Sequence, residues 1–163
     1  MPETAEMPDS AIGHAIDHAN TEKYLIFSIF NRQYAFPAQV IGEVAKCEPL
    51  YQLPLLPSYV LGVIDRYSIP YALFDIGFLL SSVPGPRNEA LVIKSDIDRI
   101  AFSIDSISGI ADITEDALLK IEIGSGPPEL NSAVRASFNW NGTDVYLLDI
   151  QRLLSRVTEK AAQ

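Results

Sequence analysis

Two histidines, His14 and His18, are spaced so that both imidazoles would lie on one face of a helix. Many zinc sites begin with this spacing. The sequence holds no third histidine and no His-Glu-x-x-His pattern, and a short isolated helix is marginal in water. We therefore predict a solvated segment at this place and no metal site.

The single cysteine and the acidic residues also lack the neighbours that chemistry would need. Cys47 has no histidine in the body of the chain to generate its thiolate, so we expect a small buried hydrophobic residue. Asp96 and Asp98 lie where a hairpin turn is expected. Glu115 and Asp116 suit the first turn of a short helix. Because the sequence also holds no phosphate-binding glycine loop, no Cys-x-x-Cys pair and no Gly-x-Ser-x-Gly elbow, it predicts no catalytic residue, no cofactor and no enzyme.

Composition narrows the class of protein further. The chain has 163 residues, of which 48% are hydrophobic and 20% are charged, so it is expected to fold as roughly one domain. The net charge of −9 disfavours binding to nucleic acid or to an anionic membrane surface. The sequence shows no secretory leader and no uninterrupted apolar run of about 18 residues. These features predict a cytoplasmic protein without a membrane-inserted segment.

Short β-type runs follow a tail at residues 1–22. Pairs of such runs are separated by turn residues, and the pair Asn141-Gly142 readily supplies the two positive φ angles of a tight turn. The predicted hairpins are 24–30 with 33–36, 91–94 with 100–104, and 137–140 with 144–148. The strongest breaks are 82–88 and 124–128. This pattern predicts an antiparallel, all-β body with a few short helices.

The two halves of the chain resemble each other. At an offset of 66 residues, one set matches another: Leu25, Phe27, Ala35-Phe36, Ile41 and Val44 with Leu91, Ile93, Ala101-Phe102, Ile107 and Ile110. At an offset of 74, Leu73 to Ile76 with Leu79-Leu80 matches Leu147 to Ile150 with Leu153-Leu154. These two segments contain Asp75 and Asp149, each of which can cap a short helix. We expect two small β-barrels, each closed by a short helix, that share one core.

One segment stands out, running from Leu53 through two prolines and Gly62 to Ile64 and then into an apolar strand that ends at Ile76. The prolines favour an extended loop, and Gly62 permits a close backbone approach. Together with Ile41-Gly42-Glu43-Val44, this segment resembles the CheW family of bacterial chemotaxis adaptors, whose members carry Ile-Pro-x-x-Pro-x-x-Ile-x-Gly-Val-x-Asn-Leu-Arg-Gly. The resemblance covers about residues 23–157.

The chain departs from the family pattern at Asn-Leu-Arg-Gly, where it reads Asp65-Arg66-Tyr67-Ser68. Tyr67 stands at the position of the family's arginine, and Ser68 stands at the position of its glycine. Arg66 could direct a guanidinium to a similar place, although in a strand a shift of one residue turns a side chain to the opposite face. The departure puts the identity of the partner in doubt and leaves the fold expectation unchanged.

The resemblance implies two five-stranded β-barrels packed around a shared hydrophobic core, with a single domain at 23–157 and a C-terminal tail at 158–163. It implies a non-enzymatic scaffold that couples the regulatory domain of a CheA-type histidine kinase to the cytoplasmic tip of a chemoreceptor, with a groove between the barrels for a receptor helical hairpin. The partner-binding residues expected from it are Ile41, Glu43, Asp65, Arg66, Tyr67 and Ser68. Two alternatives remain open: an adaptor of another pathway, such as a pilus or twitching chemosensory system, and a ligand-binding or catalytic β-barrel.

Overall fold

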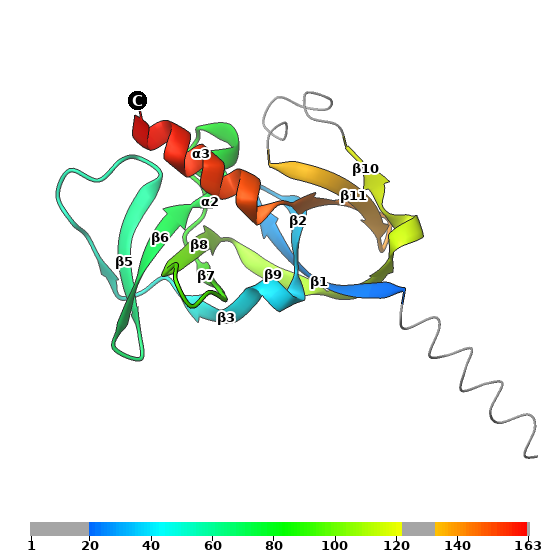
Figure 1. Cartoon of the computed structure of the whole chain (residues 1–163), viewed down its shortest axis with the longest axis horizontal. Helices are drawn as coiled ribbons and strands as arrows, with labels where there is room; N and C mark the ends of the chain where they lie inside the picture. Colours follow the sequence, from blue (N-terminus) through cyan, green and yellow to red (C-terminus); the bar gives the residue numbers. More distant parts are fainter. Residues whose placement is uncertain (1–19, 122–132, 163) are drawn as a thin grey trace, which may run out of the picture.

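The fold was analysed in a computed structural model, which describes residues 20–121 and 133–162. The histidine pair and the break at 124–128 lie outside these ranges. Twelve strands form two sheets, which lie on opposite sides of the molecule in Figure 1. Sheet A has the order β10 (Leu119–Lys120), β11 (Val134–Trp140), β12 (Thr143–Leu148), β2 (Arg32–Pro37), β1 (Thr21–Ile29) and β9 (Ser106–Thr114). Sheet B has the order β3 (Ile41–Lys46), β7 (Glu89–Ile93), β8 (Ile100–Ile104), β6 (Ile69–Asp75), β5 (Val60–Arg66) and β4 (Leu50–Tyr51).

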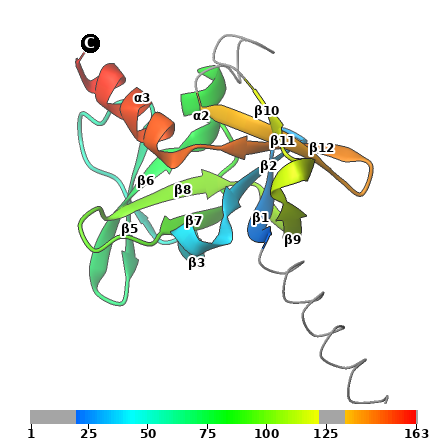
Figure 2. The same cartoon turned by 45° about the vertical axis from the view of Figure 1, so that its right-hand side comes forward.

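Helices are few and short in the described ranges. The α-helices are α2 (Ile76–Ser81) and α3 (Ile150–Ala162), and the 3₁₀ helices are η1 (Ala38–Val40) and η2 (Glu115–Ala117). Helix α3 begins where β12 ends and runs across toward the side of sheet B, as both Figure 1 and Figure 2 show. No helix in these ranges has the length and apolar character needed to span a bilayer.

The predicted all-β class is confirmed, but the expectation of two closed, five-stranded barrels is wrong. Each sheet has six strands, and hydrogen bonds do not join its two edge strands. Strand β1 begins at Thr21 and α3 continues to Ala162, and the domain limits of 23–157 stay a prediction.

The three predicted hairpins are confirmed. Strands β1 and β2, β7 and β8, and β11 and β12 pair antiparallel. In the last hairpin Asn141 and Gly142 have φ angles of 52° and 81°, as the Asn-Gly pair predicted.

The internal repeat is confirmed in its details. The offset of 66 relates β1, β2 and β3 to β7, β8 and β9, and the offset of 74 relates β5, β6 and α2 to β11, β12 and α3. Even the register shifts coincide: β3 and β9 are shifted at equivalent places, and so are β5 and β11. A bulge at the same place in both copies shows that the two halves share one backbone plan.

The two halves are interleaved in space. Sheet A combines the hairpin β1–β2 of the first half with β9 to β12 of the second, and sheet B combines β7–β8 with β3 to β6. The joints are the parallel pairs β12–β2 and β6–β8 and the antiparallel pairs β1–β9 and β3–β7. Neither sheet can therefore form from one half of the chain alone.

Side chains from one face of each sheet enter a core that both sheets share, and side chains from the other face form a smaller cluster within each sheet. Phe27 and Phe36 of sheet A meet Phe102 of sheet B in a core that both sheets share. Each sheet also encloses a smaller cluster of its own, around Phe138 in sheet A and around Ile64 in sheet B. Since burial of apolar area stabilises a fold by roughly 25 cal/mol per Å², the shared core is the main force holding the sheets together.

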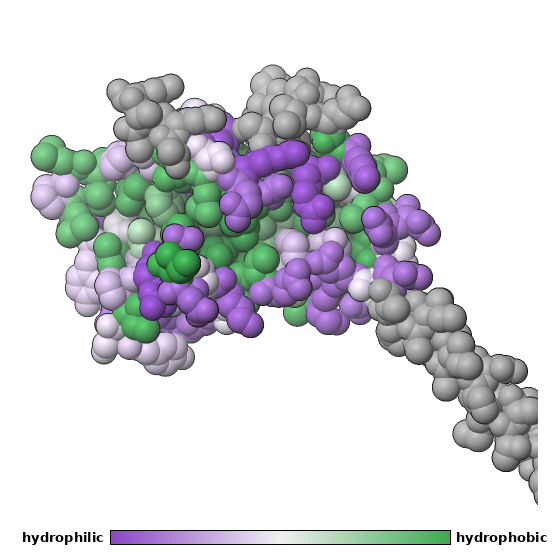
Figure 3. Space-filling view, in the orientation of Figure 1, coloured by the Kyte–Doolittle hydropathy of each residue, from purple (hydrophilic) through white to green (hydrophobic). Residues whose placement is uncertain are grey.

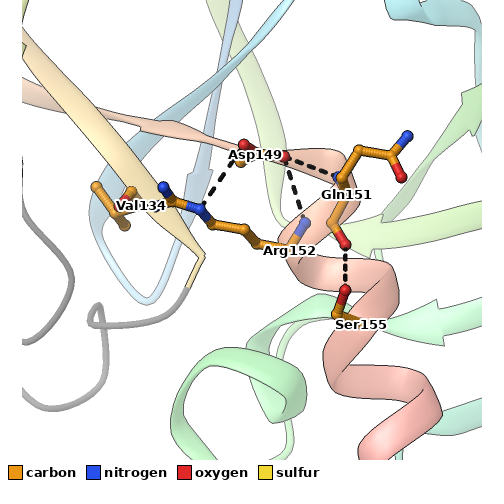
Figure 4. Close-up of polar contacts among 5 residues, drawn as sticks. All are labelled: Val134, Asp149, Gln151, Arg152 and Ser155. Atoms are coloured by element: carbon orange, nitrogen blue, oxygen red, sulfur yellow. Dashed lines mark hydrogen bonds and ion pairs between the residues drawn. The ribbon is translucent and has the colours of Figure 1, made fainter.

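Both expected aspartate caps are present. Asp75 accepts a hydrogen bond from the Phe78 amide at the start of α2. Asp149 accepts hydrogen bonds from the amides of Gln151 and Arg152 at the start of α3, as Figure 4 shows. Asp75 is only 1% exposed, and the amide of Gly85 donates to both of its carboxylate oxygens at 3.1 and 3.0 Å.

This contact predicts that Gly85→Ala destabilises the protein. A Cβ at Gly85 would lie 2.7 Å from Asp75 Oδ1 and 3.0 Å from Gly77 Cα. The segment between α2 and β7 that contains Gly85 would therefore have to move away from the carboxylate. We expect a loss of about 2 kcal/mol in the free energy of unfolding, measured with urea. Gly42→Ala is the matched control, since its Cβ would meet nothing closer than 3.5 Å. Equal stability of the two variants would contradict the role given to the Asp75–Gly85 contact.

Candidate protein-docking site

The turn between β5 and β6 departs from what its backbone favours. Tyr67 and Ser68 have φ angles of 55° and 67°, and the flanking pair is Arg66 with Ile69. A two-residue turn with both φ angles positive favours Asn-Gly, which is the pair at the equivalent place in the second half. A tyrosine in the left-handed region costs about 1–2 kcal/mol relative to a residue suited to it. Tyr67 is nevertheless 83% exposed, so burial of its side chain does not compensate for this cost.

Arg66 joins this turn to the far side of sheet B. Its guanidinium donates two hydrogen bonds to the carboxylate of Glu43, one of them from Nε to Oε2 at 3.2 Å. Two parallel bonds of this kind fix the geometry of both side chains. Hydrogen bonding to Glu43 raises the pKa of Arg66, so the guanidinium remains charged.

The same contact shows how sheet B is curved. Glu43 lies on β3 and Arg66 on β5, with three strands between them in the sheet order. Their side chains meet only because the sheet curls around its own apolar cluster. A direct ion pair between side chains thus bridges the part of the sheet that backbone hydrogen bonds leave open.

Arg66 also contacts the exposed ring. Its Cζ lies 5.2 Å from the centroid of the Tyr67 ring, within the range of a cation–π contact. Glu43, Arg66 and Tyr67 therefore form one connected group at the surface. Such a group suits protein recognition, because tyrosine and arginine are the side chains most often found at binding hot spots.

The other predicted site residues lie around this group or apart from it. Asp65 and Ser68 are exposed and flank Arg66 and Tyr67 in the chain. Ile41 is half-buried and packs against the shared core, and the register shift between Ile41 and Glu43 accounts for the different surroundings of the two side chains. The structure therefore brings together Glu43, Arg66 and Tyr67 and leaves Ile41 outside the group.

Sheet A has a counterpart of the Glu43–Arg66 contact that the sequence analysis missed. The two offsets carry Glu43 to Gly109 and Arg66 to Trp140. These residues meet as well, because a Cβ at Gly109 would lie 2.9 Å from the indole of Trp140. The same bridge is thus polar in sheet B and apolar in sheet A, and the repeat offsets contained the signal needed to find it.

Two further surfaces contain none of the predicted partner-binding residues. Exposed hydrophobic residues Tyr51, Leu53 and Leu55 lie on β4 and the loop that follows it, and Figure 3 shows hydrophobic surface over this loop. A groove of about 360 Å³ opens between the two sheets beside the start of α3. Its walls include Val40, Ile100 and Leu154, whereas Ile41, Glu43 and Tyr67 do not line it.

We expect the double variant Tyr67→Asn with Ser68→Gly to be more stable than the parent protein. Asparagine and glycine adopt the two positive φ angles more readily, so the free energy of unfolding should rise by about 1–2 kcal/mol. Chemical denaturation measures this change. A fall in stability would show instead that the tyrosine ring stabilises the fold.

Cys47 should behave as an inert thiol. It is 3% exposed, and burial raises its pKa to about 11. Because the thiolate is the reactive form, a disulfide reagent should label it at pH 8 far more slowly in the native protein than in guanidinium. The stability linked to this thiol is present below its unfolded pKa of about 8.5 and is lost as the pH rises toward 11. Rapid labelling of the native protein would contradict this account.

Comparison with known proteins agrees with this architecture. The family model described as the CheW-like domain matches residues 23–158. Among solved structures, the chain is similar to the scaffolding protein TtCheW from Thermoanaerobacter tengcongensis, with 13% sequence identity and a TM-score of 0.71 over 82% of this chain and 87% of that one. A search of curated proteins gave no match. The family model spans most of the chain, including both sheets and the turn that carries Tyr67, and the chain therefore belongs to the CheW-like domain family.

Proposed function

We propose that this protein is a non-enzymatic chemosensory adaptor in the cytoplasm. It couples a CheA-type histidine kinase, through the regulatory domain of the kinase, to the cytoplasmic tip of a chemoreceptor. Membership of the CheW-like family supports the adaptor class. The observation that carries the choice of surface is the exposed Tyr67 ring, which sits on a turn that its side chain disfavours.

The geometry of the group favours docking over chemistry. Glu43 and Arg66 are each 28% exposed at their side chains and neutralise one another. They hold the Tyr67 ring on a fixed base, so little conformational entropy is lost when a partner covers it. A partner can therefore bury the ring without desolvating an unpaired charge.

The described residues offer no comparable arrangement for catalysis. Among residues 20–121 and 133–162 there is no group of three histidine, cysteine or acidic side chains placed to hold a metal ion. The one cysteine is buried with a raised pKa. Protein binding is thus the function that this surface supports best.

The test is binding of the purified protein to a kinase regulatory domain and to a receptor cytoplasmic hairpin, measured by calorimetry. Tyr67→Ala should weaken binding to at least one of them by about 1–2 kcal/mol, which is roughly a 5- to 30-fold rise in Kd. The Tyr67→Asn with Ser68→Gly variant should lose binding similarly while gaining stability. Loss of binding then cannot be attributed to unfolding.

Asn141→Ala is the matched control, because Asn141 occupies the same place in the equivalent turn of sheet A. It should leave binding unchanged. Equal effects of the two alanine variants, or no effect of either one, would contradict the assignment of the docking surface to Tyr67.

A second candidate is an adaptor of another pathway, such as a pilus or twitching chemosensory system. The observation that favours it is the sequence Asp65-Arg66-Tyr67-Ser68 where the family has Asn-Leu-Arg-Gly. Pull-down with the tagged protein from cells that express both chemotaxis partners distinguishes the two candidates. Recovery of a kinase or receptor of a different system, diminished by Tyr67→Ala, would favour the second.

A further inference from the structure

The internal repeat gives the molecule two equivalent grooves. The smaller has a volume of about 260 Å³, and Arg32, Tyr34 and Leu80 line it. The offsets carry these residues to Asp98, Ile100 and Leu154, which line the groove of about 360 Å³ beside α3. The two grooves are therefore copies of one site, and their differences can be compared position by position.

In the first copy the chain places a segment of its own beside the start of α2. The connection from α2 to β7, residues 82–88, has the sequence Ser-Val-Pro-Gly-Pro-Arg-Asn. Gly85 donates its amide to the buried Asp75 carboxylate and packs against Gly77 so closely that a Cβ there would lie 2.8 Å from Gly85 Cα. A segment with a proline on each side of Gly85, held by one main-chain N–H, is thus seated beside the start of the helix.

In the second copy the equivalent place borders the groove beside α3. Asp149 corresponds to Asp75, and its Oδ1 accepts the amides of Gln151 and Arg152 at 2.9 and 3.3 Å. Its Oδ2 forms an ion pair with Arg152 Nε at 3.8 Å, a separation beyond hydrogen-bond distance, and Figure 4 marks this contact. No described segment lies where Gly85 lies in the first copy, and Asp149 and Gln151 line the groove instead.

We propose that this groove binds an extended, proline-containing segment of a partner protein, whose main-chain N–H donates to Asp149. The segment occupies the place that residues 82–88 occupy in the first copy. The apolar wall of Val40, Ile100 and Leu154 suits valine and proline side chains. Figure 3 shows hydrophobic surface at the centre of this face, between the two sheets.

One difference between the copies sets the depth of the bound segment. Gln151 replaces Gly77, so the segment cannot approach the helix as closely as Gly85 does. The Gln151 amide offers a donor and an acceptor to the main chain in return. This mode of binding differs from the helical hairpin that the family resemblance implies for a groove between the barrels, and it holds whichever protein supplies the segment.

The probe is the heptapeptide of residues 82–88, acetylated and amidated, added to the ¹⁵N-labelled full chain. We expect saturable shifts of the amides of Lys94, Ser95 and Gln151, which border the groove. Gln151→Trp should fill the groove and abolish these shifts. Ser155→Trp is the matched control, because Ser155 is exposed one turn further along α3 and does not line the groove, so binding should persist.

A second peptide with N-methylglycine at the central position tests the hydrogen bond. It lacks the N–H while keeping the extended shape, so its Kd should be about ten-fold higher or more. Equal affinity of the two peptides would overturn the role of Asp149. Absence of saturable shifts at the groove up to millimolar peptide, or shifts that survive Gln151→Trp, would overturn the site. The amide spectrum of each variant without peptide shows whether it is folded.

Discussion

The exchange of hairpins between the two halves is the constraint on which the rest of the structure depends. Each sheet takes two strands from one half of the chain and four from the other. The joints are the parallel pairs β12–β2 and β6–β8 and the antiparallel pairs β1–β9 and β3–β7. The shared core of Phe27, Phe36 and Phe102 therefore forms only when both halves are in place. A protein built in this way behaves as one cooperative unit, and its surfaces keep fixed positions relative to one another.

The internal repeat gives this molecule two copies of the turn, of the bridge between distant strands and of the groove. The copies differ where recognition is proposed. The turn of sheet A has the Asn-Gly that its backbone favours, and the turn of sheet B has Tyr67-Ser68. The bridge between distant strands is the ion pair of Arg66 with Glu43 in sheet B and the packing of Trp140 against Gly109 in sheet A. Gly85 is seated beside Asp75 in the first copy, whereas Asp149 borders a groove in the second. Departures from the favoured residue at one copy alone are expected where a sequence serves binding rather than folding.

Local signals in the sequence predicted much of this fold. The alternation of apolar residues, the pair Asn141-Gly142 and the two capping aspartates act over a few residues, and the structure has the hairpins and caps they indicate. The number of strands in each sheet and the exchange between halves depend on contacts between residues far apart in the chain. Local patterns carry no information on such pairing, and the expectation of two closed, five-stranded barrels was corrected for that reason.

The candidate site was predictable in its residues and not in its geometry. Family resemblance pointed to Glu43 and to the segment from Asp65 to Ser68, but the face that each side chain takes depends on register. The register shift at Gly42 gives the side chains of Ile41 and Glu43 different surroundings, and no local pattern in the sequence indicates this shift. The contact of Arg66 with Glu43 likewise depends on the curvature of sheet B.

Cross-saturation of the deuterated, ¹⁵N-labelled protein by a bound kinase regulatory domain or receptor hairpin tests the central claim most directly. This experiment identifies the amides that lie against the partner without any substitution in the protein. The account predicts saturation of the amides of residues 65–69 and of Glu43, with little transfer to the equivalent turn at 139–142. Transfer confined to other surfaces, with none at residues 65–69, would contradict it.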